Sequence, residues 1–184
     1  YSSIRQVAEV KIPVAPAKGT TDIALYGGIH FSTEDTINES GKEITTSLPD
    51  EIKRSMRGGN WNSLPGTLKE VNSIRQLFNN HKKSSKTLTG SAATEESLKD
   101  LSGHSPVILH LATHGFSLPN AIERRKNNSP GGENQFSLAD NPLLRSGIIM
   151  AGANHVWNGA DPVPGKEDGI VTAYEISTLD LSNT

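Results

Sequence analysis

Short runs rich in apolar or β-branched residues recur along this chain, separated by polar segments that carry the turn-forming residues. Four of these runs have the length of strands, at 22–28 (DIALYGG), 85–90 (SKTLTG), 107–114 (VILHLATH) and 146–153 (SGIIMAGA). Runs of this length that end at glycine or polar residues predict β-strands. The run at 107–114 is almost continuously apolar, which is typical of a strand buried on both faces of a sheet.

A different spacing marks the segment 64–83 (LPGTLKEVNSIRQLFNNHKK). Its apolar residues recur three and four positions apart, at Leu68, Val71, Ile74, Leu77 and Phe78. This spacing places them on one face of a helix, so the segment predicts an amphipathic helix. Thr67 followed by Glu70 matches the capping-box pattern and indicates where the helix begins.

Two further helices are expected from the same kind of pattern. The segment 91–103 (SAATEESLKDLSG) has Thr94 as its expected N-cap and Gly103 at its end. The segment 169–181 (GIVTAYEISTLDL) has apolar residues on a helical repeat. Strands and helices therefore alternate along the chain, and this order predicts an α/β fold with a mainly parallel sheet covered by helices.

Two long polar segments, 32–60 and 117–141, follow predicted strands and are expected to be loops. In an open parallel α/β sheet, ligands bind at the carboxyl ends of the strands. These loops therefore mark the edge of the sheet at which a functional site is expected. Residues 1–20 are expected to form a short strand and a linker.

The composition argues against a nucleic-acid-binding protein and against a membrane-spanning protein. The chain has 184 residues and a net charge of −2, which fits one domain with a sizeable core. Its basic residues are scattered apart from RRK at 124–126, so nucleic acid is not an expected partner. No apolar run approaches the roughly 20 residues that cross a bilayer, and the start of the chain shows no signal-peptide core. We expect a cytoplasmic protein without membrane contact.

The run VILHLATHGF at 107–116 contains two histidines, His110 and His114. In a helix they would lie one turn apart, as in the zinc pattern H-E-x-x-H, but Leu111 occupies the position of the glutamate. In a strand, residues four apart are separated by about 13 Å, too far for two ligands of one zinc ion. The chain also holds no cysteine, so no thiolate ligands are available. No metal site and no cofactor are expected.

The two histidines differ in their predicted places. His110 lies within the strand, where a hydrogen-bonded core histidine shielded by a helix is the expected role. His114 lies at the predicted carboxyl end of the strand, and Gly115 follows it. There an imidazole can act as a general base, and the Gly115 N–H can point at a developing oxyanion. The residues alone leave both a structural and a catalytic role open for His114. Residues four apart on one strand are expected to face the same side of the sheet.

Several motifs in order resemble the CHAT family of caspase-like cysteine peptidases. These are VILHLATHGFSLPN, NPLLRSGIIMAGAN and DGIVTAYEISTLDLSNT, preceded by the ALYGGI strand and the LPGTLKEVNSI helix. The resemblance runs from about residue 22 to the end of the chain. It implies the caspase-haemoglobinase fold, with helices on both faces of the sheet and the 22–28 strand between those at 85–90 and 107–114.

The resemblance also implies what this chain contributes. In the family a histidine followed by glycine ends one strand, matched by His114 and Gly115, and the nucleophilic cysteine ends the next parallel strand. LDLSNT at 179–184 leads into that strand, so residues 1–184 are expected to form a partial CHAT domain comparable to a caspase large subunit. Its expected partners are the C-terminal part of the domain that carries the cysteine, upstream helical repeats, and a protein or peptide substrate.

The resemblance further suggests a substrate pocket. The loop 57–65 lies where caspases build part of the first specificity pocket, which makes Trp61 and Asn62 candidate pocket residues, with Trp61 as a wall. Asp168 could recognise a basic substrate side chain, although its position before Gly169 favours a helix N-cap more strongly. The predicted function is the histidine-bearing part of a cysteine endopeptidase. The alternative is a catalytically inactive caspase-like scaffold for protein–protein contact.

Overall fold

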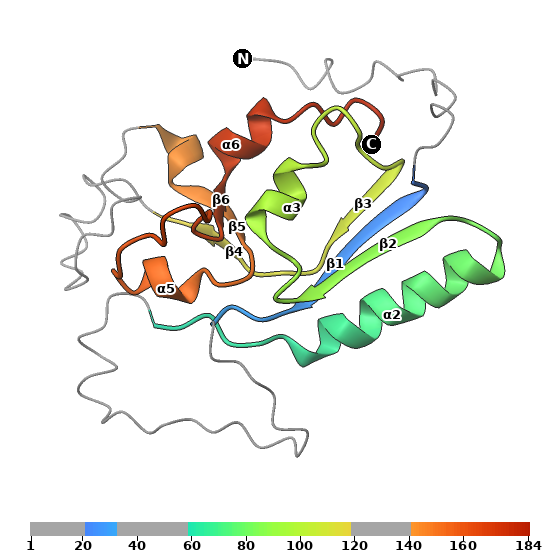
Figure 1. The fold of residues 1–184 in the computed structure, drawn as a ribbon, viewed down its shortest axis with the longest axis horizontal. Helices are drawn as coiled ribbons and strands as arrows, with labels where there is room; N and C mark the ends of the chain where they lie inside the picture. The colour runs from blue at the N-terminus through green and yellow to red at the C-terminus, as the bar shows by residue number, and fades with distance from the viewer. Residues whose placement is uncertain (1–20, 33–58, 119–140) are drawn as a thin grey trace, which may run out of the picture.

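The computed structural model describes residues 21–32, 59–118 and 141–184 (Figure 1). The strand expected within residues 1–20 lies outside these ranges, as does most of each predicted long loop. The first sheet is parallel and consists of β1 (Ile23–Ile29), β2 (Ser85–Gly90) and β3 (Ile108–Leu111). Their order is β2-β1-β3, so the predicted central place of the 22–28 strand is confirmed.

Helices cover both faces of this parallel sheet. Helix α2 (Pro65–Asn80) lies on one face, and α3 (Glu95–Lys99) lies on the opposite face (Figure 1). The predicted N-cap of α3 is confirmed, since the Thr94 side chain accepts a hydrogen bond from the Ser97 N–H. The architecture is the α/β arrangement that the alternating pattern predicted.

Helix α2 begins three residues earlier than the capping-box pattern indicated, since its cap position is Leu64 rather than Thr67. Pro65 stands in the first turn, and the cap position, Leu64, makes no side-chain cap hydrogen bond. The Thr67 hydroxyl instead donates to the Leu64 carbonyl at 2.7 Å and accepts from the Gly28 N–H at 2.8 Å. The capping-box interpretation is therefore wrong, because Thr67 ties the helix to the end of β1.

A second, antiparallel sheet was not expected. It consists of β4 (Gly115–Ser117), β5 (Ser146–Ile149) and β6 (Ile170–Thr172), in the order β4-β5-β6. The predicted strand within 146–153 is confirmed as β5. The helix predicted over 169–181 begins only at Ala173, as α6 (Ala173–Thr178), because β6 takes the residues before it.

The start of α6 shows why the N-cap interpretation of Asp168 is wrong. Thr172 caps this helix in a full capping box with Glu175, each side chain bonding the other residue's N–H. Asp168 instead accepts a hydrogen bond from the Ile170 N–H at 2.8 Å. This local bond closes a turn that directs the chain into β6.

Strand β3 is shorter and more exposed than its sequence indicated. It ends at Leu111, three residues before His114, so His114 lies in the connection to β4 rather than at the last strand position. Val107 and Ile108 are 36% and 45% exposed. The prediction that this run is buried on both faces is wrong within the described residues, because β3 forms an edge of its sheet.

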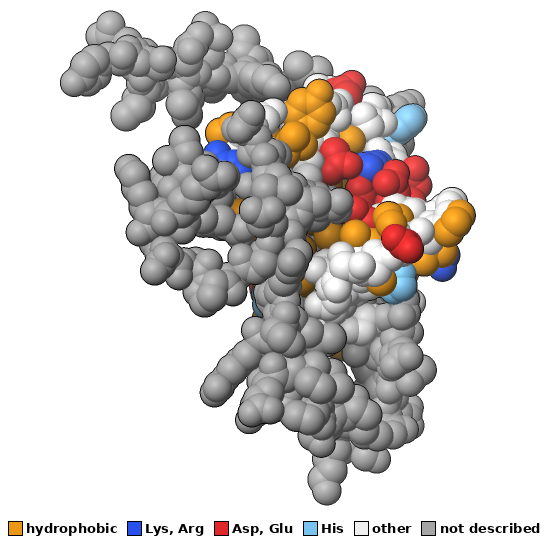
Figure 2. All heavy atoms as spheres, turned by 90° about the vertical axis from the view of Figure 1, so that its left-hand side faces the viewer, with side chains coloured by type: hydrophobic (Ala, Val, Ile, Leu, Met, Phe, Trp, Pro, Cys, Tyr) orange, Lys and Arg blue, Asp and Glu red, His pale blue; other side chains and the backbone are white. Residues whose placement is uncertain are grey.

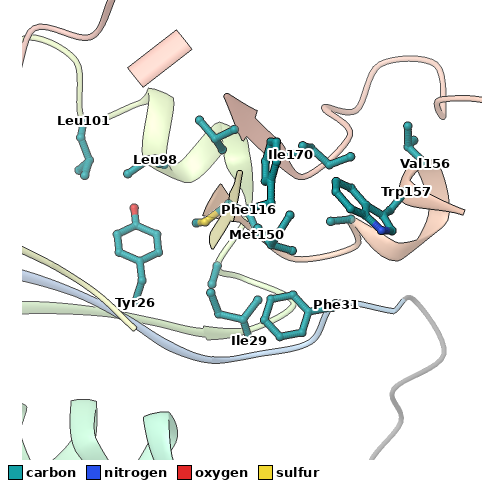
Figure 3. Packing of buried hydrophobic residues seen from close by; sticks show 14 of the residues in the cluster. Tyr26, Ile29, Phe31, Leu98, Leu101, Phe116, Met150, Val156, Trp157 and Ile170 are labelled. Atoms are coloured by element: carbon teal, nitrogen blue, oxygen red, sulfur yellow. The ribbon is translucent and has the colours of Figure 1, made fainter. Parts of the chain in front are cut away.

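One core connects the two sheets. Tyr26 points from β1 toward Leu98 and Leu101, and the cluster continues through Phe31 and Met150 (Figure 3). The Tyr26 hydroxyl donates to the Ser97 carbonyl at 2.9 Å. The 3₁₀ helix η3 (Pro142–Leu144) and helix α5 (Asn154–Trp157) complete the described elements. None of the helices in these ranges has both the length and the apolar composition that a membrane crossing needs.

Candidate active site

His114 is half-buried beside two aromatic rings at the junction of the two sheets. The centroid of its imidazole lies 5.1 Å from that of Phe31 and 5.1 Å from that of Trp61, both in tilted arrangements. Phe31 follows β1 and is buried, and Trp61 precedes α2 and is partly buried. The structure therefore brings His114 and Trp61, from the loop before α2, into contact as expected.

A main-chain carbonyl orients the imidazole. His114 Nε2 lies 2.8 Å from the carbonyl oxygen of Asn62. A carbonyl oxygen can only accept, so Nε2 carries the hydrogen and donates it. In the neutral ring this leaves Nδ1 with the lone pair. The site thus holds an imidazole whose basic nitrogen is Nδ1.

The Gly115 amide points away from its partner strand. Two main-chain bonds at the ends of this pair of strands fix the pattern: His114 O accepts from the Ile149 N–H at 2.9 Å, and the Leu118 N–H donates to Arg145 O at 2.7 Å. Bonded and non-bonded pairs alternate in an antiparallel ladder, which puts the Gly115–Ile148 pair at a non-bonded position. Gly115 is also exposed. Its N–H is directed away from β5, beside His114.

Comparison with models of known protein families agrees with the resemblance that the sequence motifs indicated. The family model described as CHAT domain matches residues 8–184, almost the whole chain. The chain belongs to the CHAT domain family. No curated protein and no solved structure matches it. The family has a caspase-like α/β fold, and the parallel sheet with helices on both faces is consistent with it.

His110 has a different environment in this CHAT domain. It pairs with Leu25 in the β1–β3 ladder, and its Nε2 lies 3.1 Å from the Glu70 carboxylate of α2. The expected covering helix is therefore present, but the expected hydrogen bond is not: His110 Nε2 has no hydrogen-bond partner among the described residues, and its side chain is still 30% exposed. His114 contacts Phe31 and Trp61, which belong to or pack against the main core cluster. Since β3 ends at Leu111, the strand's alternation does not extend to His114.

Asp168 lies in an acidic cluster of the CHAT domain rather than among the residues that contact His114. Lys99 of α3 binds three carboxylates there, with Nζ–O distances of 2.8 Å to Glu95, 3.1 Å to Glu167 and 3.1 Å to Glu175. The Glu95 carboxylate also accepts from the Gly169 N–H at 2.9 Å. Figure 2 shows red acidic side chains gathered on one face of the molecule. The cluster joins α3 to β6 and α6.

Burial dominates the electrostatics of Glu95. It is 1% exposed, and burial raises the pKa of its carboxyl to about 7, although Lys99 lies beside it and opposes the shift. Burial also raises the pKa of Asp168. Lys99, Asp168, Glu167 and Glu175 are the charged groups that face Glu95 in this cluster. Between pH 4.5 and about 7, folding therefore takes up protons at Glu95.

Replacing Glu95 with glutamine should flatten the pH dependence of stability. Between the unfolded pKa near 4.5 and the folded pKa of about 7, the folded protein binds more protons at Glu95 than the unfolded chain does. Stability contributed by this group is therefore lost as the pH rises through that window. From pH 5 to pH 8 the wild type should lose about 2–3 kcal/mol, or about 5–10 °C in Tm, through this group.

The matched control is the neighbouring Glu96→Gln. Hydrogen bonding lowers the pKa of Glu96 against the opposing effect of burial, so Glu96 is already ionised throughout that window. Thermal melts at pH 5 and pH 8 should show a smaller Tm difference for Glu95→Gln and an unchanged difference for Glu96→Gln. Equal Tm differences in wild type and Glu95→Gln would contradict the assignment.

Sequence reasoning missed two residues of the site, Phe31 and Asn154. Phe31 supplies a ring beside His114, and the Asn154 side chain is hydrogen-bonded to both the N–H and the C=O of Trp61. Asn154 stands in GANHVW at 152–157, which resembles an ordinary loop after a strand. The contact joins residues 93 positions apart, and no local pattern signals such a partner. Only the family motif could have drawn attention to it.

Proposed function

We propose that this CHAT domain supplies the general base and one oxyanion donor of a cysteine endopeptidase. The observation that carries the proposal is the His114 imidazole, whose Nε2–H is held by the Asn62 carbonyl beside the outward-pointing Gly115 N–H. This leaves Nδ1 to take a proton from a thiol. The chain contains no cysteine, and the proposal takes the nucleophile from the strand that the family resemblance implies after LDLSNT.

The open edge of β3 is where that segment fits. The Asn183 N–H donates to the Ser105 hydroxyl at 3.1 Å, and the Thr184 hydroxyl donates to the Pro106 carbonyl at 2.8 Å. These contacts hold residues 183–184 beside the chain that enters β3. A strand that continues from there would run parallel to β3 and cover the exposed Ile108. About 5–6 residues would bring it level with the end of β3, on the way to His114.

The chemical steps follow from this arrangement. His114 Nδ1 takes the thiol proton, and the thiolate attacks the scissile carbonyl carbon. The Gly115 N–H donates a hydrogen bond to the oxygen that becomes negative. The protonated His114 then gives the proton to the leaving amine as the C–N bond breaks. Water, activated by the same imidazole, hydrolyses the thioester and restores the thiol.

Thiol labelling of the intact protein tests this function. The full-length protein is treated with iodoacetamide, and the modified cysteines are located by mass spectrometry during assays on a peptide library. We expect a cysteine within about a dozen residues after Thr184 to be alkylated fastest, and cleavage to stop in step with that alkylation. Cleavage that survives complete alkylation would refute the proposal. A full-length protein that cleaves no peptide would favour the inactive scaffold.

Trp61 is proposed as a wall of the pocket for the residue before the scissile bond, and Asn62 as its neighbour there. Trp61→Ala should raise KM about tenfold and change the preferred residue at that position, because the ring that packs against His114 is lost. The matched control is Tyr174→Ala on α6, an aromatic residue that is 49% exposed. If Trp61→Ala has the KM of the wild type and the same preferred residue before the scissile bond, Trp61 is not part of the pocket.

A further inference from the structure

Asn154, at the start of α5, uses its whole amide in hydrogen bonds. It is 4% exposed. Its Oδ1 accepts from the Trp61 N–H at 2.8 Å, and its Nδ2 donates to the Trp61 carbonyl at 3.0 Å and to the Ser32 hydroxyl at 2.9 Å. Its main-chain N–H donates to the Phe31 carbonyl at 2.9 Å. One buried residue therefore binds two segments that are far apart in the sequence.

Those two segments surround His114. Phe31 and Trp61 are the residues whose rings lie 5.1 Å from the imidazole. Asn62, whose carbonyl accepts from His114 Nε2, directly follows Trp61. Because Asn154 holds both the N–H and the C=O of Trp61, the chain that leads into the Asn62 carbonyl has little freedom to rotate. Asn154 itself does not contact the imidazole in the described structure.

We infer that Asn154 is a positioning residue that fixes the tautomer and orientation of His114 through the main chain of Trp61 and Asn62. The inference rests on the proposed function for its catalytic meaning, although the effect on the imidazole is independent of it. Asparagine suits the role because its short amide offers both an acceptor and two donors. Aspartate keeps the acceptor toward the Trp61 N–H and loses both donated bonds.

The chain offers a closely matched control on the same helix. Asn158, which ends α5, donates from its Nδ2 to the Asn60 side chain at 2.7 Å. It is exposed, and its bond reaches a side chain two residues before Asn62 rather than the main chain of Trp61. Asn154→Asp and Asn158→Asp are therefore the same chemical change at two points of contact between α5 and the same segment.

The experiment compares these variants in the full-length protein. Histidine labelled with ¹⁵N reports the tautomer of His114 by NMR, with His114→Gln to assign its signals, and steady-state assays separate kcat from KM. We expect the Nε2–H form to dominate in the wild type. Asn154→Asp should give a mixture of tautomers and lower kcat about tenfold with KM within about twofold, and Asn158→Asp should resemble the wild type.

Ser32→Ala is a milder variant that still tests the inference if Asn154→Asp does not fold. It removes the hydroxyl that accepts from Asn154 Nδ2, and it should move the tautomer ratio and kcat in the same direction by a smaller factor, about twofold. Wild-type tautomer and kcat in Ser32→Ala, with Asn154→Asp either unfolded or equally unaffected, would overturn the inference. An equal effect of Asn158→Asp would also overturn it. If the wild type cleaves nothing, the proposed function fails, and the tautomer signals still decide the role of Asn154.

Discussion

His114→Ala should abolish peptide cleavage by the full-length protein and leave the fold intact. In the proposed mechanism the imidazole takes the thiol proton and returns it to the leaving amine, so its loss should lower kcat/KM by at least about 10²–10⁴-fold. Its removal costs little packing, because His114 is only half-buried and lies at the junction of two short strands. Cleavage of a peptide panel and thermal melts, measured side by side, give the two readouts.

His110→Ala is the matched control for that result. His110 lies four positions earlier, against Glu70 of α2, and its replacement should change stability by about 1 kcal/mol without a comparable loss of activity. The peptidase function requires that the two variants separate in this way. If His114→Ala cleaves peptides at the wild-type rate, the proposed peptidase function is refuted. Equal losses of activity in both variants would instead indicate a general disturbance of β3.

Gly147→Ala should destabilise the protein by about 3 kcal/mol or more. Gly147 lies in β5, the middle strand of the antiparallel sheet. A methyl group there would overlap the Val171 carbonyl oxygen and would stand 2.9 Å from the Phe116 ring and 2.9 Å from the Thr172 Cα. Two of these three contacts are main-chain atoms of the neighbouring strand, which cannot move aside as a flexible side chain can.

Gly66→Ala provides the contrast for this steric effect. Gly66 lies in the first turn of α2, and a methyl group added there would meet no atom within 4 Å. Alanine is the better helix former, so this variant should be neutral or more stable by a few tenths of a kcal/mol. Denaturant unfolding of both variants measures the difference. A Gly147→Ala protein as stable as the wild type would show that β5 and β6 are not packed as described.

The first sheet could be predicted because its elements carry their own local patterns. The three- and four-residue spacing in 64–83 specified α2, and Thr94 specified the start of α3. The resemblance to caspases supplied the strand order. The antiparallel sheet could not be predicted in this way, since β4 and β6 have only three residues each. Over so short a segment, the strand pattern of Ile170–Thr172 cannot be distinguished from the start of the helix that follows.

The site was predicted in part for a similar reason. His114, Gly115 and Trp61 follow from the family motif and from the place of the histidine after an apolar run. The substrate-recognition role of Asp168 was suggested by its carboxylate in the family-like stretch at 168–184, and the structure places it in a turn beside the buried Glu95. Burial and long-range hydrogen bonds decide such positions, and neither leaves a signature in the neighbouring residues.

The hydrogen bond that orients His114 has a consequence for how such domains can diverge. Its acceptor is the main-chain carbonyl of Asn62, and the Asn62 side chain is exposed. Every amino acid supplies the same carbonyl oxygen. Selection for new substrates can therefore replace the side chain at position 62 freely while the base keeps its orientation. Variation at position 62 is therefore compatible with the same orientation of His114, and loss of the proposed base is recognised at His114 itself.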